Sequence, residues 1–201
     1  MGLIIGANRK ADKVIRRRLT PSSLGRSGDP NRGEWCTPKW LAEAVGHWDL
    51  DPFSNARSHI LADASCSLER GDDGFGDGSP GSHLRALRGH PRLRIADQDY
   101  RVWLQPPYGI VSRAFAHYRH TRWCALLRFD PRTRWWNEIY EACEVIAVIR
   151  RSPDDEAFNF EPPPGVEASS NPYPHALYYA QGRDMTPAVE KLCAVWRKKP
   201  R

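Results

Sequence analysis

The chain has 201 residues, of which 40% are hydrophobic and 27% are charged, and its formal net charge is +6. The length suits one domain with a proper core, and the composition is ordinary for a soluble globular protein. No apolar run approaches the length of a membrane span, and the apolar start at residues 1–6 is too short for a signal-peptide core. We therefore expect a cytoplasmic protein with no membrane partner, whose positive charge suits a polyanion such as DNA.

The cysteine pattern excludes a disulfide framework. The five cysteines are odd in number, widely spaced and without a Cys-x-x-Cys pair: Cys36, Cys66, Cys124, Cys143 and Cys193. We expect reduced thiols that behave mostly as small buried hydrophobic residues. The seven histidines show no metal-ligand spacing either, so the sequence predicts no bound metal.

Residues 1–33 form a basic segment that precedes the predicted domain. Basic clusters at residues 9–10 and 16–18 are followed by a stretch rich in proline, serine and glycine. This composition predicts a flexible arm, which either contacts phosphates or is a solvated tail. We predict a single folded domain over residues 34–201.

The first predicted helix begins near Thr37-Pro38. Thr37 suits the N-cap and Pro38 the first helical position, and Leu41, Ala44 and Val45 form an apolar stripe. The pattern predicts an amphipathic helix. Its free N–H groups and positive dipole end also suit a carboxylate, such as that of methionine.

A short strand is predicted next, ending at Asp51-Pro52. An acidic side chain at a strand end can hold the amino group or the ribose of a nucleoside cofactor, although Asp-Pro turns without function are frequent. Further along, a stretch at about residues 76–94 is rich in glycine, serine, histidine and arginine. We predict an exposed basic insertion, whose arginines, including Arg85 and Arg88, either follow a nucleic-acid backbone or are simply solvated.

The most informative stretch is residues 102–109, where an apolar strand stops at Gln105-Pro106-Pro107-Tyr108. Proline cannot donate to a β-ladder and fixes its own φ, so a stiff loop must follow the strand. Open α/β sheets place their ligand crevices at such carboxyl ends. The Gln105 carboxamide, the Pro106 carbonyl and the Tyr108 ring together suit a planar base with an exocyclic amine. A turn that only caps a buried strand is the alternative.

The remainder of the chain alternates between helices and apolar strands. We predict a helix over residues 111–119, a strand over 123–129, a helix through 135–140 with Thr133 near its N-cap, and strands at 145–149 and 176–180. Near-continuous apolar strands separated by helices favour an α/β sheet that is covered on both faces.

Taken in order, these pieces resemble the phage-encoded Dam-like DNA N6-adenine methyltransferase family. The matching stretches are Trp35-Cys36-Thr37-Pro38 and residues 50–55, 72–74, 102–109, 132–136 and 160–180. The similarity covers roughly residues 34–182. It implies a Rossmann-like methyltransferase fold with a mixed, mostly parallel sheet and helices on both faces. It also implies S-adenosylmethionine as cofactor and adenine in double-stranded DNA as substrate.

The resemblance assigns roles to individual positions. The catalytic loop is Gln105, Pro106, Pro107 and Tyr108. The cofactor-binding residues are Trp35, Thr37, Pro38, Asp51, Pro52, Phe53, Asp72 and Asp73. The DNA-binding residues are Arg85, Arg88, Arg132, Arg134 and Trp135. The chain departs from the family at two of these positions: Gln105 replaces the usual Asn, and Arg134 stands where the family often has Asp.

The implied chemistry needs acceptors, because the N6 amine of adenine is conjugated with its ring and is a poor nucleophile. The Gln105 oxygen and the Pro106 carbonyl would accept its N–H bonds, and stacking on Tyr108 would contribute about 1–3 kcal/mol. Gln reaches about 1.5 Å further than Asn. We predict an active enzyme. Two alternatives are an inactive relative that binds DNA or cofactor without methylating, and a methyltransferase of another amine or amide.

Overall fold

The computed structural model describes residues 35–67, 71–75, 99–150, 158–167 and 173–198. The predicted arm at residues 1–33 and the predicted insertion at about 76–94, with Arg85 and Arg88, lie outside these described ranges.

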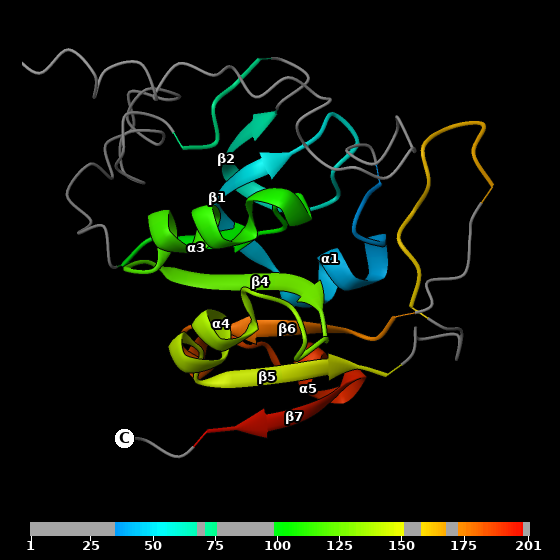
Figure 1. The fold of residues 1–201 in the computed structure, drawn as a ribbon. Helices are drawn as coiled ribbons and strands as arrows, with labels where there is room; N and C mark the ends of the chain where they lie inside the picture. The colour runs from blue at the N-terminus through cyan, green and yellow to red at the C-terminus, as the bar shows by residue number, and fades with distance from the viewer. Residues whose placement is uncertain (1–34, 68–70, 76–98, 151–157, 168–172, 199–201) are drawn as a thin grey trace, which may run out of the picture.

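The described residues form one seven-stranded sheet in the order β2-β1-β3-β4-β6-β5-β7 (Figure 1). The strands are β1 (His47–Ser54), β2 (Leu61–Ser67), β3 (Arg101–Leu104), β4 (Arg122–Arg128), β5 (Val145–Ile149), β6 (His175–Tyr179) and β7 (Cys193–Arg197). The helices are α1 (Lys39–Val45), α3 (Val111–Tyr118), α4 (Trp136–Ala142) and α5 (Pro187–Leu192), with 3-10 turns at Tyr108–Ile110 and Gly182–Asp184.

The sheet is mixed, which confirms the predicted α/β class, but it is not mostly parallel. β1 pairs in parallel with β2 and β3, and β3 with β4, whereas the β4–β6, β5–β6 and β5–β7 pairs are antiparallel. The prediction of a mostly parallel sheet is therefore wrong. The physical reason is the position of β6, which lies between β4 and β5 in the opposite direction. Apolar runs identify buried strands but do not encode their direction.

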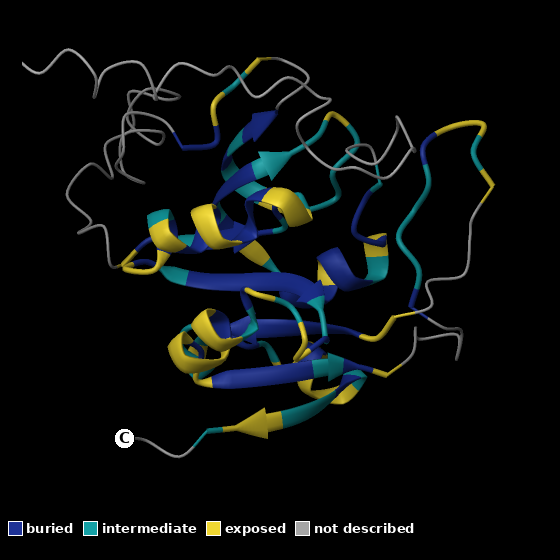
Figure 2. Cartoon of the chain, in the orientation of Figure 1, coloured by how far each residue is buried: buried dark blue, intermediate teal, exposed yellow. Residues whose placement is uncertain are grey.

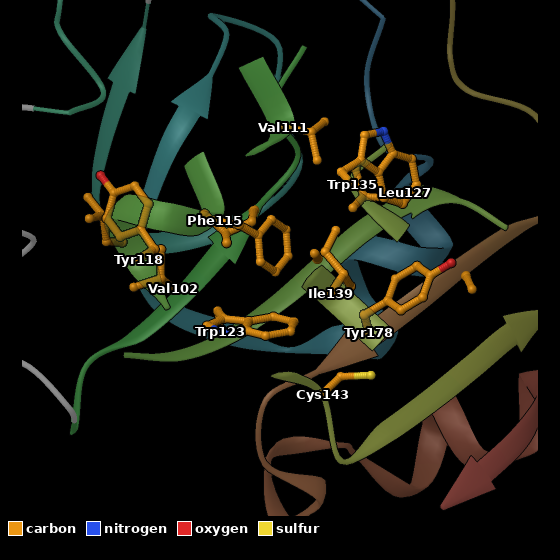
Figure 3. Close-up of a cluster of buried hydrophobic side chains, with 14 of the residues drawn as sticks. Val102, Val111, Phe115, Tyr118, Trp123, Leu127, Trp135, Ile139, Cys143 and Tyr178 are labelled. Atoms are coloured by element: carbon orange, nitrogen blue, oxygen red, sulfur yellow. The ribbon is translucent and has the colours of Figure 1, made fainter. Parts of the chain in front are cut away.

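Two hydrophobic clusters cover the two faces of the sheet. On one face α3 and α4 pack against the strands, and Figure 3 shows Phe115, Trp123, Ile139 and Tyr178 gathered there. On the other face α1 and α5 pack over a cluster that contains Trp48. Figure 2 shows the central strands buried, whereas β7 becomes exposed toward its end. Helices on both faces match the expectation from the sequence.

Several predicted elements are confirmed, with corrections at their ends. The strand at residues 145–149 has the predicted bounds, and α3 and β4 agree to within one residue at each end. α1 has Pro38, not Thr37, at its N-cap. β1 continues past Asp51 to Ser54, with irregular pairing where Pro52 lacks an N–H. α4 begins only at Trp136, because Thr133 instead closes a turn by donating to the Asp130 carbonyl at 2.9 Å.

The five cysteines are free and buried, as expected. Over the described ranges, no helix is long and apolar enough to cross a membrane. In the same part of the chain, no group of three or more acidic, histidine or cysteine side chains is arranged to hold a metal ion.

Candidate functional site

The strand order creates a topological switch point between β1 and β3. The chain passes from β1 to β2 on one side, and then crosses to β3 on the other side of β1. All three strands are parallel, so their carboxyl ends lie at one end of the sheet. Open α/β sheets bind ligands in the crevice outside such ends. We call Asp51-Pro52-Phe53, at the end of β1, and Gln105-Pro106-Pro107-Tyr108, after β3, the switch-point site.

Asp51 is a buried carboxylate at the β1 side of this site, only 2% exposed. It accepts hydrogen bonds from the Phe53 N–H at 3.3 Å and from the Ser58 hydroxyl at 3.5 Å. Burial raises its pKa to about 7, although these hydrogen bonds act in the opposite direction. A cation bound beside Asp51 would favour the ionised form and recover part of the desolvation cost.

Gln105 is joined to α1 through Thr37, whose buried hydroxyl donates to Gln105 Oε1. Two predicted site residues that are 68 positions apart therefore meet. A carboxamide oxygen has two lone pairs, so Oε1 retains the capacity to accept a second hydrogen bond from a ligand amine. The Thr37 contact fixes the direction of that oxygen. Within the same loop Pro106 is buried, and Tyr108 is 44% exposed.

Tyr108 is held by a histidine that the sequence analysis did not identify. Its hydroxyl lies 3.2 Å from Nε2 of His175, and Nδ1 of His175 lies 3.0 Å from the Tyr173 carbonyl. Because that carbonyl can only accept, Nδ1 carries the proton and Nε2 accepts from the phenol. Burial lowers the pKa of His175 to about 4, so the ring is neutral at pH 7. In the sequence, His175 is recognisable only as a polar residue at the start of an apolar strand.

Asp72 and Asp73 lie in a turn that packs on the β1 end of the site. Asp72 accepts from the Ser67 N–H and Asp73 from the Phe75 N–H, both at 2.9 Å. The turn approaches very closely: a Cβ added to Gly74 would lie 2.3 Å from the Pro52 carbonyl oxygen. The Asp72 carboxylate thus helps to close the turn and is half-buried, whereas Asp73 is exposed to solvent.

Glu161 fastens α1 to the loop after β1, and sequence reasoning missed it. Its carboxylate accepts from the Lys39 N–H at 2.9 Å and lies 2.7 Å from Nε2 of His59. Its backbone pairs with that of Cys36. Glu161 therefore takes one N–H group at the start of α1, where we expected a cofactor carboxylate to bind. Lys39 and Glu161 are 122 positions apart in the sequence, so no local pattern indicates this contact.

In the described part of the chain, the remaining predicted residues make no hydrogen bond to the switch-point residues, and one of them lies in the core. Trp35 is half-buried. Arg132 and Arg134 are exposed after β4, and Arg132 contacts the Asp130 carboxylate at 2.9 Å, which lowers the pKa of Asp130. Trp135 is buried among the core residues of the α4 face, so packing accounts for it and little of its ring is open to a base.

The comparisons give no independent identification. No protein-family model, curated protein or solved structure matches the chain. A shallow hollow lies far along the sheet, against α5 and β7, and is lined by Glu190, Cys193, Val195 and Arg197. It contains none of the predicted catalytic, cofactor-binding or DNA-binding residues. The class that the geometry defines is an α/β protein with polar groups gathered at a topological switch point.

Proposed function

We propose that this protein is an S-adenosylmethionine-dependent methyltransferase of the N6 amine of adenine in DNA, acting in the cytoplasm of a bacterial host. The observation that carries the proposal is the position of Gln105-Pro106-Pro107-Tyr108. The loop leaves β3 at the switch point, its carboxamide oxygen is oriented by Thr37, and its aromatic ring is exposed. These are an acceptor and a stacking surface at the end of the sheet where ligands bind.

The β1 side of the site fits a cationic cofactor. S-adenosylmethionine carries an ammonium group and a sulfonium, and when bound it supplies the methyl group. The buried Asp51 carboxylate would pair with its positive charge, and this pairing would favour the ionised form of an acid whose pKa burial has raised to about 7. The ring of Phe53 and the exposed carboxylate of Asp73 would hold its nucleoside part.

The β3 side would position the target amine. Gln105 Oε1, through its second lone pair, and the Pro106 carbonyl would accept the two N–H bonds of the amine and turn its lone pair toward the methyl group. The new N–CH3 bond would form as the S–CH3 bond breaks and S-adenosylhomocysteine leaves, and the cationic nitrogen would then lose a proton to water, so that no titrating side chain is assigned to this step. Tyr108 would stack on the flipped adenine, and about 1–3 kcal/mol of stacking helps to offset the few kcal/mol lost on unstacking.

The Thr37 contact also bears on the longer side chain at position 105. An Asn there would end about 1.5 Å short of the Gln carboxamide. The hydrogen bond draws the Gln105 oxygen toward α1, so the added methylene is taken up within the protein and need not displace the substrate. Correct placement matters, since an error of about 1 Å can cost on the order of a hundredfold in rate.

The same contact favours a second candidate, a protein that binds DNA or cofactor without transferring a methyl group. If the Thr37 hydroxyl saturates the Gln105 oxygen, the amine keeps only the Pro106 acceptor. A methyltransferase of another amine or amide would use the same loop and remains the third possibility from the sequence.

Incubation of unmethylated DNA with labelled S-adenosylmethionine, followed by nucleoside analysis, tests the proposal. We expect N6-methyladenosine from the wild type, at least a hundredfold less from Gln105→Ala, and a reduced yield from Gln105→Asn. Calorimetry with S-adenosylhomocysteine should show near-normal cofactor binding in both variants. A wild type that binds this cofactor product but leaves DNA unlabelled would support the binding-only candidate. Unchanged transfer in Gln105→Ala would contradict the catalytic role of the loop.

A further inference from the structure

Arg128 places a positive charge next to Tyr108. It is the last residue of β4 and is in register with His175 of β6. Its guanidinium carbon lies 3.6 Å from the ring centre of Tyr173 and 5.3 Å from that of Tyr108. The two rings are 42% and 44% exposed. The cation is therefore held at the surface, between two aromatic side chains beside the switch-point site.

In the described part of the chain, the acidic side chain that acts on this charge is Asp130, whose pKa Arg128 helps to lower without forming an ion pair. Arg128 makes no ion pair there, and its Nε is buried without a hydrogen-bond partner. Asp130, two residues further on, accepts three hydrogen bonds from Arg132. His175 is neutral at pH 7 and brings no charge of its own. A partly desolvated guanidinium that has no ion-pair partner attracts an anion, and its planar fork matches a phosphate.

We propose that Arg128 binds the phosphate of the nucleotide whose base stacks on Tyr108. This inference rests on the proposed function for the identity of the base, and it adds a phosphate subsite to the switch-point site. A nucleotide carries its phosphate one sugar away from its base, so a cation beside the stacking ring reaches the phosphate while the ring holds the base. Phosphate contacts of this kind fix the register of a nucleic acid and do not read its sequence.

A purely structural role makes a different prediction. If Arg128 only holds Tyr108 and Tyr173 in place, its loss weakens the binding of a base and of a nucleotide by the same factor. If Arg128 binds phosphate, its loss weakens only the ligand that carries one. The difference between the two ligands is therefore the measured quantity.

The test is an NMR titration of the full chain with deoxyadenosine, deoxyadenosine 5′-monophosphate and inorganic phosphate. We expect the wild type to bind the nucleotide about tenfold more tightly than the nucleoside, and more tightly than inorganic phosphate. Arg128→Gln should abolish this preference, and Arg128→Lys should retain part of it because the charge remains. Arg119→Gln is the matched control, since it removes an exposed arginine near the amino end of β4 and should keep the full preference.

Three results would overturn the inference: no preference for the nucleotide in the wild type, an equal loss for both ligands in Arg128→Gln, or inorganic phosphate binding as tightly as the nucleotide. The assay needs no methyl transfer, so the two proposals fail separately. A nucleotide preference that depends on Arg128, in a protein that leaves DNA unmethylated, refutes the methyltransferase but keeps the phosphate subsite. If the protein methylates DNA but Arg128→Gln leaves the preference for the nucleotide unchanged, the methyltransferase proposal is kept and the phosphate subsite is refuted.

Discussion

Asp51 gives the stability of the protein a pH dependence whose size follows from its burial. The substitution to test is Asp51→Asn, which keeps the shape and one acceptor oxygen but cannot ionise. The pKa of Asp51 is raised from 3.8 to about 7, mainly by desolvation. A shift of roughly 3 units corresponds to about 4 kcal/mol at 1.36 kcal/mol per unit. That free energy is the cost of keeping the ionised carboxylate in the folded protein.

The sign follows from proton binding. Between pH 3.8 and about 7 the folded protein holds a proton on Asp51 that the unfolded chain has released. The unfolded state therefore binds fewer protons, and the free energy of unfolding falls as pH rises through this window. Below the window Asp51 is neutral in both states, and above it the full cost is present. Asp51→Asn carries no such cost at any pH.

Urea denaturation at pH 5 and pH 8 measures the effect. Two of the three pH units lie between pH 5 and the folded pKa, so the stability of Asp51→Asn relative to the wild type should rise by about 3 kcal/mol between these conditions. Equal m-values for the two proteins serve as the control, because they show that both unfold from comparable native states. A stability difference that is the same at both pH values would refute the argument that burial has raised the pKa of this carboxyl.

Three further outcomes are expected. Calorimetry should show that the affinity for S-adenosylmethionine rises between pH 6 and pH 8 in the wild type but not in Asp51→Asn, because a bound cation favours the ionised carboxylate. The same pH dependence of affinity in both proteins would contradict the pairing of Asp51 with the cofactor. Glu161→Ala should lower the free energy of unfolding by about 1–3 kcal/mol through the lost contacts with Lys39 N–H and His59, and Glu161→Gln should lower it by less. Equal losses for the two variants in urea titrations would show that these contacts do not contribute to stability through the side-chain oxygens of residue 161. Ile139→Ala, at a fully buried position, should cost about 2–5 kcal/mol in the same titrations. The exposed Asn137→Ala on the same helix should change stability by less than about 0.5 kcal/mol.

The interior strands were predictable because their amino-acid composition is almost entirely apolar. β4 and β5 are nearly continuous apolar runs, and a buried strand of this kind needs no partner to be recognised. β2 was missed, because it consists largely of alanine, serine and cysteine and only part of it is buried. β7 was missed for a related reason: it is an edge strand whose last residues are exposed. Strand order and direction depend on long-range pairing, which no local pattern records.

The candidate site was predictable where its chemistry is local. The change from an apolar strand to Gln105-Pro106-Pro107-Tyr108 marked the end of β3, whereas Asp51-Pro52 lies near the end of β1, which continues to Ser54. Contacts between distant segments were not predictable, as Glu161 shows. Trp135 illustrates a further limit, because tryptophan serves equally as a stacking surface and as core, and only packing distinguishes the two.

The reversed direction of β6, which makes the sheet less parallel than expected, also completes the candidate site. Parallel strands bring only their carboxyl ends to the switch point. An antiparallel strand brings its amino end to the same place, and β6 thereby sets His175 beside Arg128, where β4 ends. Had β6 run parallel to β4, His175 would lie at the opposite end of the sheet, Tyr108 would lose its hydrogen-bond acceptor, and Arg128 would lose the ring of Tyr173. The strand that breaks the parallel pattern thus supplies the support for the aromatic ring on which the proposed base contact depends.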